Sequence, residues 1–460
     1  MLKPLLLSEV AAPLAARVVG ADVTFSSVST DSRKIEPGQL FIALSGPNFD
    51  GHDYLADVAG KGAVAALVAR EVAGAPLPQL LVQDTRIALG QLGALNRQAF
   101  HKPLAAVTGS SGKTTVKEML ASILRAGLDG EVLATRGNLN NDLGAPLTLL
   151  ELASEHVGAV IELGANHVGE IAYTVGLTRP QVAIITNAGV AHVGEFGGPD
   201  KIIEAKGEIL DGLAADGVAV LNGDDKAFAT WQARAKGRHV TSFALHDSSA
   251  DFHASELARD ARGCQAFTLY SPVGQARIQL NLLGTHNVAN ALAAAAAAHA
   301  LGVPLVGIQS GLENVKPVKG RAVAHLAPNG ARVIDDTYNA NPISVCAAID
   351  ILAGFSGRTV LVLGDIGELG AWAEQGHRDV GAYATGKVDA LYAVGPLMAH
   401  AVTAFGTQGQ RFADQASLIA ALRREPGDIT ILIKGSRSAA MENVVNALIA
   451  TTSCANGEAH

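Results

Sequence analysis

A short glycine loop constrains the possible folds of this chain more than any other segment, because loops of this kind join a strand to a helix and bind one kind of ligand. Its seven residues are Gly109, Ser110, Ser111, Gly112, Lys113, Thr114 and Thr115. Apolar residues 104–107 precede the loop, and apolar residues at helical spacing follow it as far as Asp129. In such a loop, backbone N–H groups and the helix N-terminus face a phosphate, Lys113 supplies a cation, and the Thr114 hydroxyl can bind magnesium. We therefore expect a strand, a phosphate-binding loop and a helix that begins at Thr115, with a nucleoside triphosphate as ligand.

The loop has the short GxxGKT spacing. The longer GxxxxGK[ST] form would need glycine at the position that Val107 occupies. A glycine-rich turn without function is the alternative interpretation, but the strand pattern before the loop and the helix pattern after it favour phosphate binding.

Length and charge exclude several classes of protein. A chain of 460 residues is too long for one ordinary core and suggests about three domains. Its net charge of -8 argues against a nucleic-acid groove, although a few basic residues suffice for a small phosphorylated ligand. Cys264, Cys346 and Cys454 form neither a metal motif nor a disulfide framework, and no apolar stretch is long enough to span a membrane. We expect a cytoplasmic monomer that binds no nucleic acid and has no membrane span.

Apolar runs that alternate with helical patterns divide the chain into three α/β domains. Residues 1–84 form a small N-terminal domain, residues 85–314 carry the phosphate loop, and residues 315–460 repeat the alternation as a Rossmann-like domain. Because helices separate its apolar runs, the central domain should contain a parallel sheet. The expected strands lie at residues 104–107, 157–163, 182–186 and 218–221 in the central domain, and at 332–335, 360–363, 390–394 and 429–433 in the C-terminal domain.

Polar side chains at two central strand ends are candidate metal ligands. Glu162 ends an apolar run and could hold magnesium opposite Thr114. His192 follows the next strand, on the side where open α/β sheets bind ligands. Alternatively, Glu162 is an exposed carboxylate at a strand end and His192 has only a structural role.

Lys206 is unusual because it shares one face of a predicted helix, residues 200–213, with apolar side chains. Glu204 and Glu208 should point away from that face. Burial lowers the pKa of a lysine amine, so that the neutral amine can add carbon dioxide and, as a carbamate, bind a second magnesium ion. A lysine whose ammonium reaches water along the helix is the alternative.

Further polar residues suit a nucleotide or a charged substrate. Asn287 and Asn290 open a predicted helix, and their amides suit an adenine edge on which His286 could stack, although helix capping would explain them equally. Arg321 and Asp336 suit phosphate and ribose hydroxyls. Asp365 and Lys434 end further strands, where ordinary turns are the alternative.

Together these segments resemble the Mur ligase family, whose members are ATP-dependent amide-forming enzymes of peptidoglycan precursor assembly. The resemblance covers all three predicted domains. Further strings that carry it are TDSR at 30–33, FDGHD at 49–53, NLNN at 138–141, YNANP at 338–342 and KGSR at 434–437. They are most similar to the member that adds D-alanyl-D-alanine to UDP-N-acetylmuramoyl-tripeptide. The Asp-Asn-Pro-Arg string of the sister enzyme that adds the third residue is absent, and folylpolyglutamate synthase lacks the N-terminal uridine-nucleotide domain.

The resemblance implies a role for each group of residues. The loop would bind ATP, and Thr114, Glu162, His192 and a carbamylated Lys206 would hold two magnesium ions. The adenosine-binding residues would be His286, Asn287, Asn290, Arg321, Asp336, Tyr338 and Asn339. The N-terminal domain would bind the UDP moiety, and the C-terminal strand ends would present D-alanyl-D-alanine. The substrate-binding residues would be Ser29, Thr30, Asp31, Ser32, Arg33, Gly46, Asp50, Gly51, His52, Asn138, Asn140, Asn141, Asp365, Lys434, Ser436 and Arg437.

The implied reaction phosphorylates a peptide carboxylate to an acyl phosphate, which the dipeptide amine then attacks. The third residue of the tripeptide would be diaminopimelate or lysine. A phosphoryl transferase would share the loop but leave phosphate on its acceptor, and a nucleotide-gated binding protein would need no amine. Dependence of phosphate release on the dipeptide separates these three classes.

Overall fold

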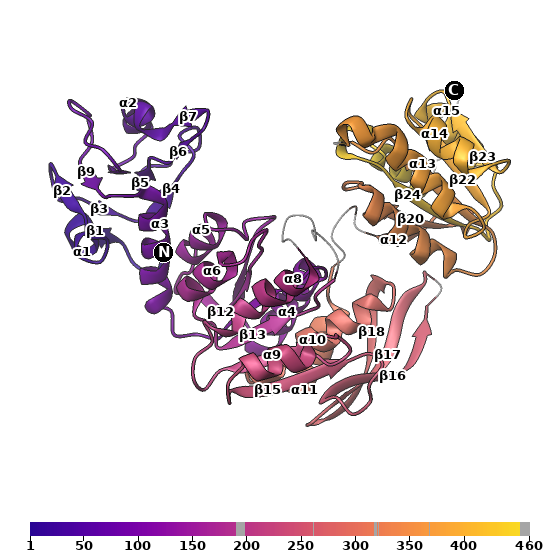
Figure 1. Ribbon diagram of the computed structural model, residues 1–460, viewed down its shortest axis with the longest axis horizontal. Helices are drawn as coiled ribbons and strands as arrows, with labels where there is room; N and C mark the ends of the chain where they lie inside the picture. Colours follow the sequence, from indigo (N-terminus) through magenta and orange to yellow (C-terminus); the bar gives the residue numbers. More distant parts are fainter. Residues whose placement is uncertain (190–197, 261, 317–319, 321, 368, 451–460) are drawn as a thin grey trace, which may run out of the picture. The chain divides into compact units, whose positions relative to one another are not determined.

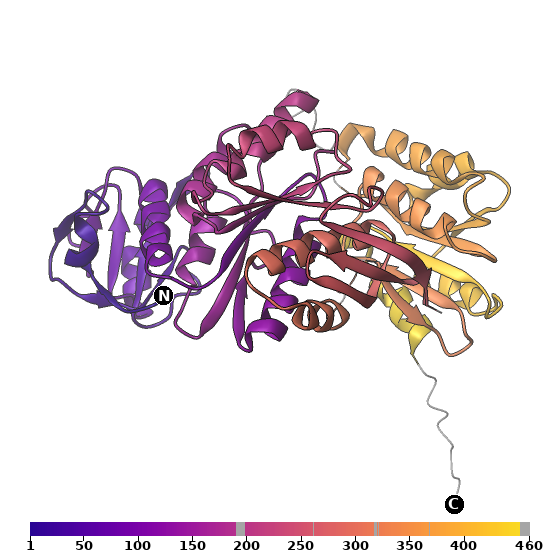
Figure 2. The same cartoon turned by 90° about the horizontal axis from the view of Figure 1, so that it is seen from below.

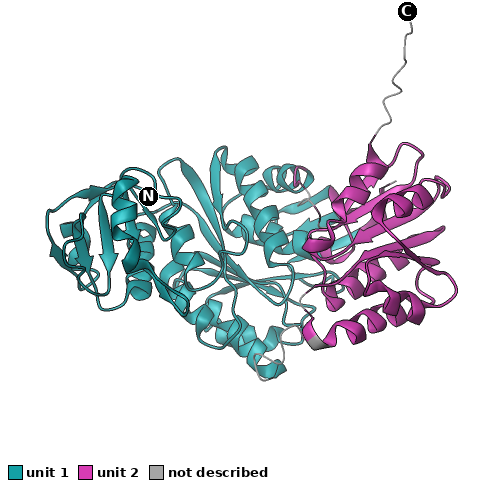
Figure 3. Ribbon diagram, turned by 90° about the horizontal axis from the view of Figure 1, so that it is seen from above, with its two compact units in different colours: residues 1–255, 268–278, 288–313 teal, residues 256–267, 279–287, 314–460 magenta. Residues whose placement is uncertain are grey.

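The chain has α/β structure in the residues that the computed structural model describes, which are 1–189, 198–260, 262–316, 320, 322–367 and 369–450. Its internal contacts divide it into two units. Unit 1 comprises residues 1–255, 268–278 and 288–313, and unit 2 comprises residues 256–267, 279–287 and 314–460 (Figure 3).

The N-terminal part of unit 1 is built on a five-stranded sheet (Figure 1). In spatial order its strands are β2 (Arg17–Val19), β9 (Gln79–Leu81), β8 (Ala65–Val68), β5 (Gln39–Ile42) and β4 (Ser27–Ser29). β2 is antiparallel to β9, and the other neighbours are parallel. The shorter elements around it are β1 (Leu5–Leu6), α1 (Leu7–Ala11), β3 (Thr24–Phe25), β6 (Ser45–Gly46), β7 (Phe49–Asp50), η1 (Gly51–Tyr54) and α2 (Leu55–Gly60).

Helix α3 (Thr85–Gln98) leads from this sheet toward the phosphate loop. The Asp84 carboxylate begins the helix by accepting hydrogen bonds from the N–H groups of Arg86 and Ile87. The helix packs against α5 (Gly144–Leu150) and α6 (Glu170–Thr178). The buried Asn96 amide fixes this packing by donating to the carbonyl oxygens of Leu149 and Leu152 at 2.8 and 3.0 Å.

A nine-stranded sheet forms the central part of the chain. In spatial order its strands are β11 (Glu131–Ala134), β12 (His156–Glu162), β10 (Leu104–Thr108), β13 (Val182–Ile185), β14 (Val218–Asn222), β15 (His239–Ala244), β16 (Phe252–Arg259), β17 (Cys264–Ser271) and β18 (Gly274–Leu283). Neighbours from β11 to β16 are parallel, which confirms the predicted parallel sheet. Helices lie on both faces of this sheet (Figure 2). Besides α5 and α6, they are α4 (Lys113–Leu128), α8 (Pro199–Gly207), η2 (Glu208–Leu210), α9 (Phe228–Arg234), α10 (His286–Ala300) and α11 (Leu305–Glu313).

Several details differ from the sequence-based expectations. Strands β15 to β18 were not predicted. The helix after the loop begins at Lys113 rather than Thr115, because Gly112 caps it in the left-handed conformation. The helix predicted at 200–213 ends at Gly207, and a 3₁₀ turn follows. Glu208 is buried, because its carboxylate accepts hydrogen bonds from the N–H groups of Gly169 and Ala172 at the start of α6, so the expectation that it points away from the apolar face is wrong.

The main sheet of unit 2 has six strands, and all neighbours except β19 and β20 are parallel. In spatial order they are β19 (Val323–Leu326), β20 (Arg332–Asp336), β24 (Thr430–Lys434), β21 (Thr359–Gly364), β22 (Ala390–Val394) and β23 (Gly409–Phe412). The helical elements are α12 (Pro342–Ala353), η3 (Gly370–Trp372), α13 (Ala373–Ala384), α14 (Met398–Phe405), α15 (Gln415–Leu422), η4 (Arg437–Ala439) and α16 (Glu442–Ile449). In the described part of the chain, no helix has both the length and the apolar character that crossing a membrane requires.

Candidate active site around the phosphate loop

The phosphate loop lies between the end of β10 and the start of α4, as predicted. Gly109 and Gly112 have positive φ angles of 149° and 79°, in the region that favours glycine. Space is restricted as well, because a Cβ at Gly109 would collide with the Thr186 hydroxyl and a Cβ at Gly112 with the side-chain oxygen of Asn290. A larger residue at either position would therefore move the loop.

The carboxyl end of β13 holds the loop backbone. The N–H groups of Ser110 and Ser111 donate to the carbonyl oxygen and the Oδ1 of Asn187, at 3.0 and 3.1 Å. The Thr186 hydroxyl donates to the carbonyl oxygen of Ser111 at 2.6 Å. Sequence reasoning missed Thr186, although its position at the end of a predicted parallel strand was the available signal.

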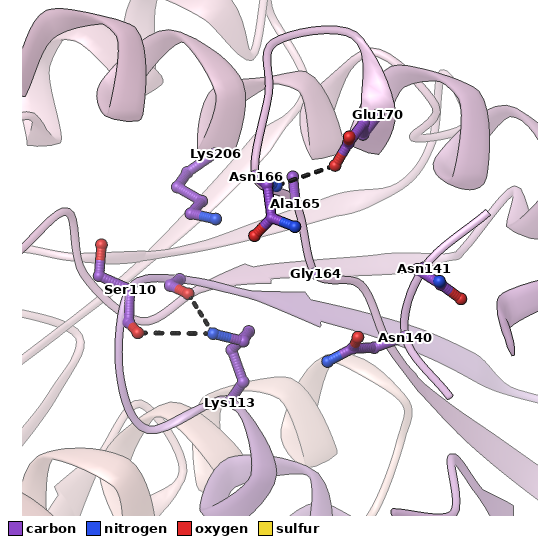
Figure 4. Close-up of a pocket in the computed structure, with 10 residues that line it drawn as sticks. Ser110, Lys113, Asn140, Asn141, Gly164, Ala165, Asn166, Glu170 and Lys206 are labelled. Atoms are coloured by element: carbon purple, nitrogen blue, oxygen red, sulfur yellow. Dashed lines mark hydrogen bonds between the residues drawn. The ribbon is translucent and has the colours of Figure 1, made fainter. Parts of the chain in front are cut away.

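A cavity of about 190 Å³ opens over the loop (Figure 4). Lys113 and Lys206 approach it from α4 and α8, while Asn140 and Glu170 line its margin. The Lys113 ammonium donates to the carbonyl oxygen of Gly109 at 2.6 Å. Burial lowers the pKa of Lys113, and the negative charge of Glu162 opposes that shift. Two lysine side chains over a glycine loop form an arrangement that suits phosphate groups.

Lys206 is buried among the apolar residues of α8, as predicted, and is 3% exposed. Its pKa is lowered to about 8, mainly by burial and secondly by the positive charge of Lys113, whereas Glu170 and Glu208 act in the opposite direction. The neutral amine that a carbamate requires is therefore accessible near pH 8.

The Glu162 carboxylate ends β12 and pairs in register with Val107, just before the loop. Asn140 donates to its Oε1 at 3.0 Å, but its buried Oε2 accepts no hydrogen bond from the residues that the structure describes. The Lys117 ammonium lies 4.0 Å from Oε2 and donates instead to the carbonyl oxygen of Thr135 at 2.6 Å. A buried carboxylate oxygen without a donor is unfavourable unless a cation approaches it, so Glu162 fits a metal-binding role.

The other expected metal ligands are only partly described. Thr114 is the second residue of α4, and His192 lies outside the described residues. Within the described ranges, no three His, Cys, Asp or Glu side chains form a group that could hold a metal ion.

The predicted adenine-binding residues lie in the first turns of α10. The oxygen of the Asn290 amide is next to Gly112, so this residue belongs to the loop cluster. The Asn287 amide donates to the carbonyl oxygen of Leu283 at 2.8 Å, which is not a capping bond, because a capping side chain accepts from a backbone N–H of the first turn. Burial lowers the pKa of His286 and favours a neutral ring.

In unit 2, the ends of β20 and β24 bring Asp336 and Lys434 together. The Lys434 ammonium donates to Asp336 Oδ2 at 2.7 Å and to the carbonyl oxygen of Asn339 at 2.9 Å. Burial raises the pKa of Asp336, and Lys434 opposes that shift. Tyr338 is largely exposed next to this pair in the sequence, and Arg321 lies outside the described residues.

The other C-terminal candidates lie at the ends of β21 and β24. The Ser436 hydroxyl donates to the carbonyl oxygen of Asp365 at 2.6 Å. Asp365 also lines a cavity of about 190 Å³ with Gly395. Arg437 is exposed and pairs with Glu442 at 3.1 Å.

The N-terminal candidates form two local groups outside the loop cavity. Asp31 accepts a hydrogen bond from the Arg33 Nε at 2.8 Å, and the bonds from Arg33 lower the pKa of Asp31 to about 2. Ser29, Thr30 and Ser32 belong to the same segment.

In the second group, Asp50 accepts from Arg70 at 2.6 Å, and the Nε2 of buried His52 accepts from the Ala69 N–H at 2.9 Å. These bonds attach the segment to the end of β8. A Cβ on Gly51 would lie 2.7 Å from the Leu44 carbonyl oxygen, and Gly46 lies under the ring of Phe49.

The segment after β11 supplies the asparagines at the loop cavity. Asn140 and Asn141 line the cavity, whereas Asn138 is exposed and does not. Asn141 Oδ1 also accepts from the Gly144 N–H at 2.8 Å, at the start of α5.

The structure thus gathers Lys113, Glu162, Lys206, Asn140 and Asn290 around one loop in unit 1. Sequence reasoning missed three neighbours of this cluster. Asn166 and Glu170 follow the strand that Glu162 ends, and buried Lys117 shares a helix face with Ala121 and Leu124. The spacing of that apolar face was the signal for Lys117.

Comparisons with known proteins agree along the whole chain. Family models match at residues 24–97 (Mur ligase family, catalytic domain), 107–298 (Mur ligase middle domain) and 320–437 (Mur ligase, glutamate ligase domain). The UDP-N-acetylmuramoyl-tripeptide–D-alanyl-D-alanine ligase of Escherichia coli (strain K12) is 46% identical, over 97% of this chain and 99% of its own.

Two solved structures are similar over most of their length. The UDP-N-acetylmuramoylalanyl-D-glutamyl-2,6-diaminopimelate–D-alanyl-D-alanyl ligase of Acinetobacter baumannii is 40% identical, with a TM-score of 0.84 and coverage of 97% of this chain and 98% of that one. The MurF ligase of Thermotoga maritima, solved in complex with ADP, is 26% identical, with a TM-score of 0.77 and coverage of 92% and 96%.

Proposed function

The chain belongs to the Mur ligase family, and we infer that it is the ATP-dependent ligase that joins D-alanyl-D-alanine to UDP-N-acetylmuramoyl-tripeptide. The products are UDP-N-acetylmuramoyl-pentapeptide, ADP and phosphate, in a step of peptidoglycan synthesis. Identity to the Escherichia coli ligase over nearly the full length of both chains carries this conclusion. The cavity over the phosphate loop, lined by Lys113 and Lys206, is the site that such a reaction needs.

The reaction follows from the charges around the loop. The terminal carboxylate of the tripeptide attacks the γ-phosphorus in line, and ADP leaves. Lys113 stabilises the negative charge on the phosphoryl oxygens as the bond to ADP breaks. The neutral amine of D-alanyl-D-alanine then attacks the carbonyl carbon of the acyl phosphate, and the tetrahedral intermediate expels phosphate to leave the amide. Because water also hydrolyses acyl phosphates, the site must exclude water during this step.

We propose that two magnesium ions take part. Thr114 and Glu162 would hold one ion, and His192 and a carbamate on Lys206 would hold the second. Bound magnesium would neutralise negative charge on the nucleotide phosphates. Support comes from Glu162 Oε2, which accepts no hydrogen bond from the described residues, and from the lowered pKa of Lys206, whose neutral amine would add carbon dioxide and release a proton.

The remaining roles are proposals from the same resemblance. Residues 1–84 would bind the UDP moiety, residues 85–314 ATP, and residues 315–460 D-alanyl-D-alanine. Asn290, beside the loop, is the best placed of the adenosine candidates. Since ATP and UDP-linked precursors are cytoplasmic metabolites, we also propose a cytoplasmic location, and we expect a monomer.

Phosphate release from ATP tests the proposed function. With UDP-N-acetylmuramoyl-tripeptide present, release should depend on added D-alanyl-D-alanine, and a new amide product should appear by mass spectrometry. A phosphoryl transferase would instead yield a phosphorylated acceptor, and a nucleotide-gated binding protein would yield no amide. Release that is independent of the dipeptide, without a new amide, would overturn the assignment.

A further inference from the structure

A second cavity in unit 1 adjoins the cavity over the phosphate loop. Its volume is about 490 Å³, and Glu170 lines both cavities, so the two meet at the N-terminus of α6. The charged and hydroxyl groups that line it are Asp84, Arg86, Asp142, Glu170 and Tyr173. Asp84 and Arg86 come from the start of α3, and Asp142 from the segment before α5.

Arg86 and Asp142 form an ion pair with unused hydrogen-bonding capacity. The Arg86 Nη2 donates to Asp142 Oδ2 at 2.6 Å, and the two side chains are 51% and 39% exposed. In the described part of the chain this is the only hydrogen bond of the guanidinium, which leaves most of its N–H donors and the second oxygen of Asp142 for a ligand. An exposed pair of this kind adds little to stability, so a ligand can readily replace either partner.

The Tyr173 hydroxyl lies among the same charges. Burial raises its pKa, and the negative charges of Asp142 and Asp84 add to the shift, while Arg86 opposes it. Within the described residues this hydroxyl makes no hydrogen bond, so it is available to a ligand as donor or acceptor. The cavity therefore combines one cation, three carboxylates and a hydroxyl in its lining.

We propose that this second cavity binds the side-chain end of the third residue of the tripeptide, and that it selects a side chain ending in both an ammonium and a carboxylate, as in diaminopimelate. The inference rests on the proposed function, in which the α-carboxylate of that residue is phosphorylated over the loop. Its side chain then starts in the first cavity and extends into the adjoining one. Arg86 binds the carboxylate of the side chain, and Asp142 with Asp84 binds the ammonium. A lysine side chain offers no group to Arg86.

Substitution Arg86→Met tests the proposal in the full-length protein. The substrates are two UDP-N-acetylmuramoyl-tripeptides that end in meso-diaminopimelate or in L-lysine. For the diaminopimelate substrate, kcat/KM should fall about 10- to 100-fold through an increase in KM, the size expected when a hydrogen bond to a charged group is lost. For the lysine substrate, kcat/KM should change less than about threefold. Arg17→Met is the matched control, because it removes a similar exposed pair with Glu71 (2.9 Å) far from the cavity in the sequence and should leave both values unchanged.

Each outcome decides the question. An equal loss of kcat/KM for both substrates in Arg86→Met would mean that the ion pair only holds α3 to the segment before α5. No change in kcat/KM for either substrate would mean that the substrate does not use the cavity. Either result overturns the proposal. If Arg86→Met does not fold, Arg86→Lys keeps the charge but not the planar two-point contact, and it should still reduce the preference for diaminopimelate. If the wild-type protein shows no dipeptide-dependent phosphate release, the proposed function fails. Calorimetric measurement of the binding of the two tripeptides to wild type and Arg86→Met then tests separately whether the cavity binds the third residue.

Discussion

Two clusters of charged side chains lie at carboxyl ends of parallel strands, but they differ in how far their charges are satisfied. In the loop cluster of unit 1, Glu162 Oε2 is buried without a donor among the described residues, and burial together with the positive charge of Lys113 lowers the pKa of Lys206. In the C-terminal cluster, the Lys434 ammonium already bonds the Asp336 carboxylate and the Asn339 carbonyl. The loop cluster therefore contains charged groups that a bound ligand can neutralise. In the C-terminal cluster, the charged groups already neutralise each other within the protein. Substitutions in the loop cluster should therefore reduce activity, and substitutions in the C-terminal cluster should reduce stability.

The largest expected effect is on activity, from Lys206→Ala. We expect ligation to fall by about three orders of magnitude or more, because the site loses the group that carries the carbamate. Added bicarbonate should restore part of the rate. The matched control is Lys201→Ala on the same helix, where an exposed lysine pairs with Glu204 at 2.7 Å; it should keep normal activity. Full activity of Lys206→Ala, measured as amide formation, would show that the reaction needs no carbamate on Lys206.

The next effect is on stability, from Lys434→Met. Removing one partner of a buried pair leaves Asp336 uncompensated and should lower the free energy of unfolding by about 3 to 5 kcal/mol in denaturant titrations. The double variant Asp336→Asn/Lys434→Met should recover much of that loss. If Lys434→Met instead keeps full stability while ligation fails, the C-terminal cluster binds a ligand directly and the contrast between the two clusters is wrong.

A smaller effect should appear in the pH profile. Because the pKa of Lys206 is lowered to about 8, the neutral amine increases about fivefold between pH 7 and pH 8. At a fixed, limiting concentration of dissolved carbon dioxide, the ligation rate should therefore rise through this range. The same shift has a consequence for stability. Between pH 8 and the ordinary value of 10.5 the unfolded chain binds more protons at this lysine, so its contribution to stability increases with pH. A rate that is flat or falling from pH 7 to pH 8 would contradict the role of the neutral amine.

The loop cluster was largely predictable, because its residues are tied to local patterns. The strand, loop and helix around Gly109 are adjacent in the sequence, and the burial of Lys206 follows from the apolar face it shares. What was missed depends on pairing between distant segments. Glu208 is buried because its carboxylate bonds the N–H groups of Gly169 and Ala172 at the start of α6, and Thr186 reaches the loop only because β13 lies beside β10.

Strand β18 was missed for a related reason. In β18 buried and partly exposed residues alternate, so no continuous apolar run marks it in the sequence. The Arg86 and Asp142 pair also joins positions 56 residues apart in the chain, and no local spacing indicates that contact.

Transfer of an oxygen isotope tests the central claim most directly. The terminal carboxylate of UDP-N-acetylmuramoyl-tripeptide is labelled with ¹⁸O on both oxygens, and the protein is supplied with ATP and D-alanyl-D-alanine in ordinary water. If the loop cluster converts this carboxylate to an acyl phosphate, one labelled oxygen leaves with phosphate and the other stays in the new amide. Mass spectrometry should then find one ¹⁸O in each released phosphate. Unlabelled phosphate formed together with the amide would show that the carboxylate was never phosphorylated, and would contradict the account.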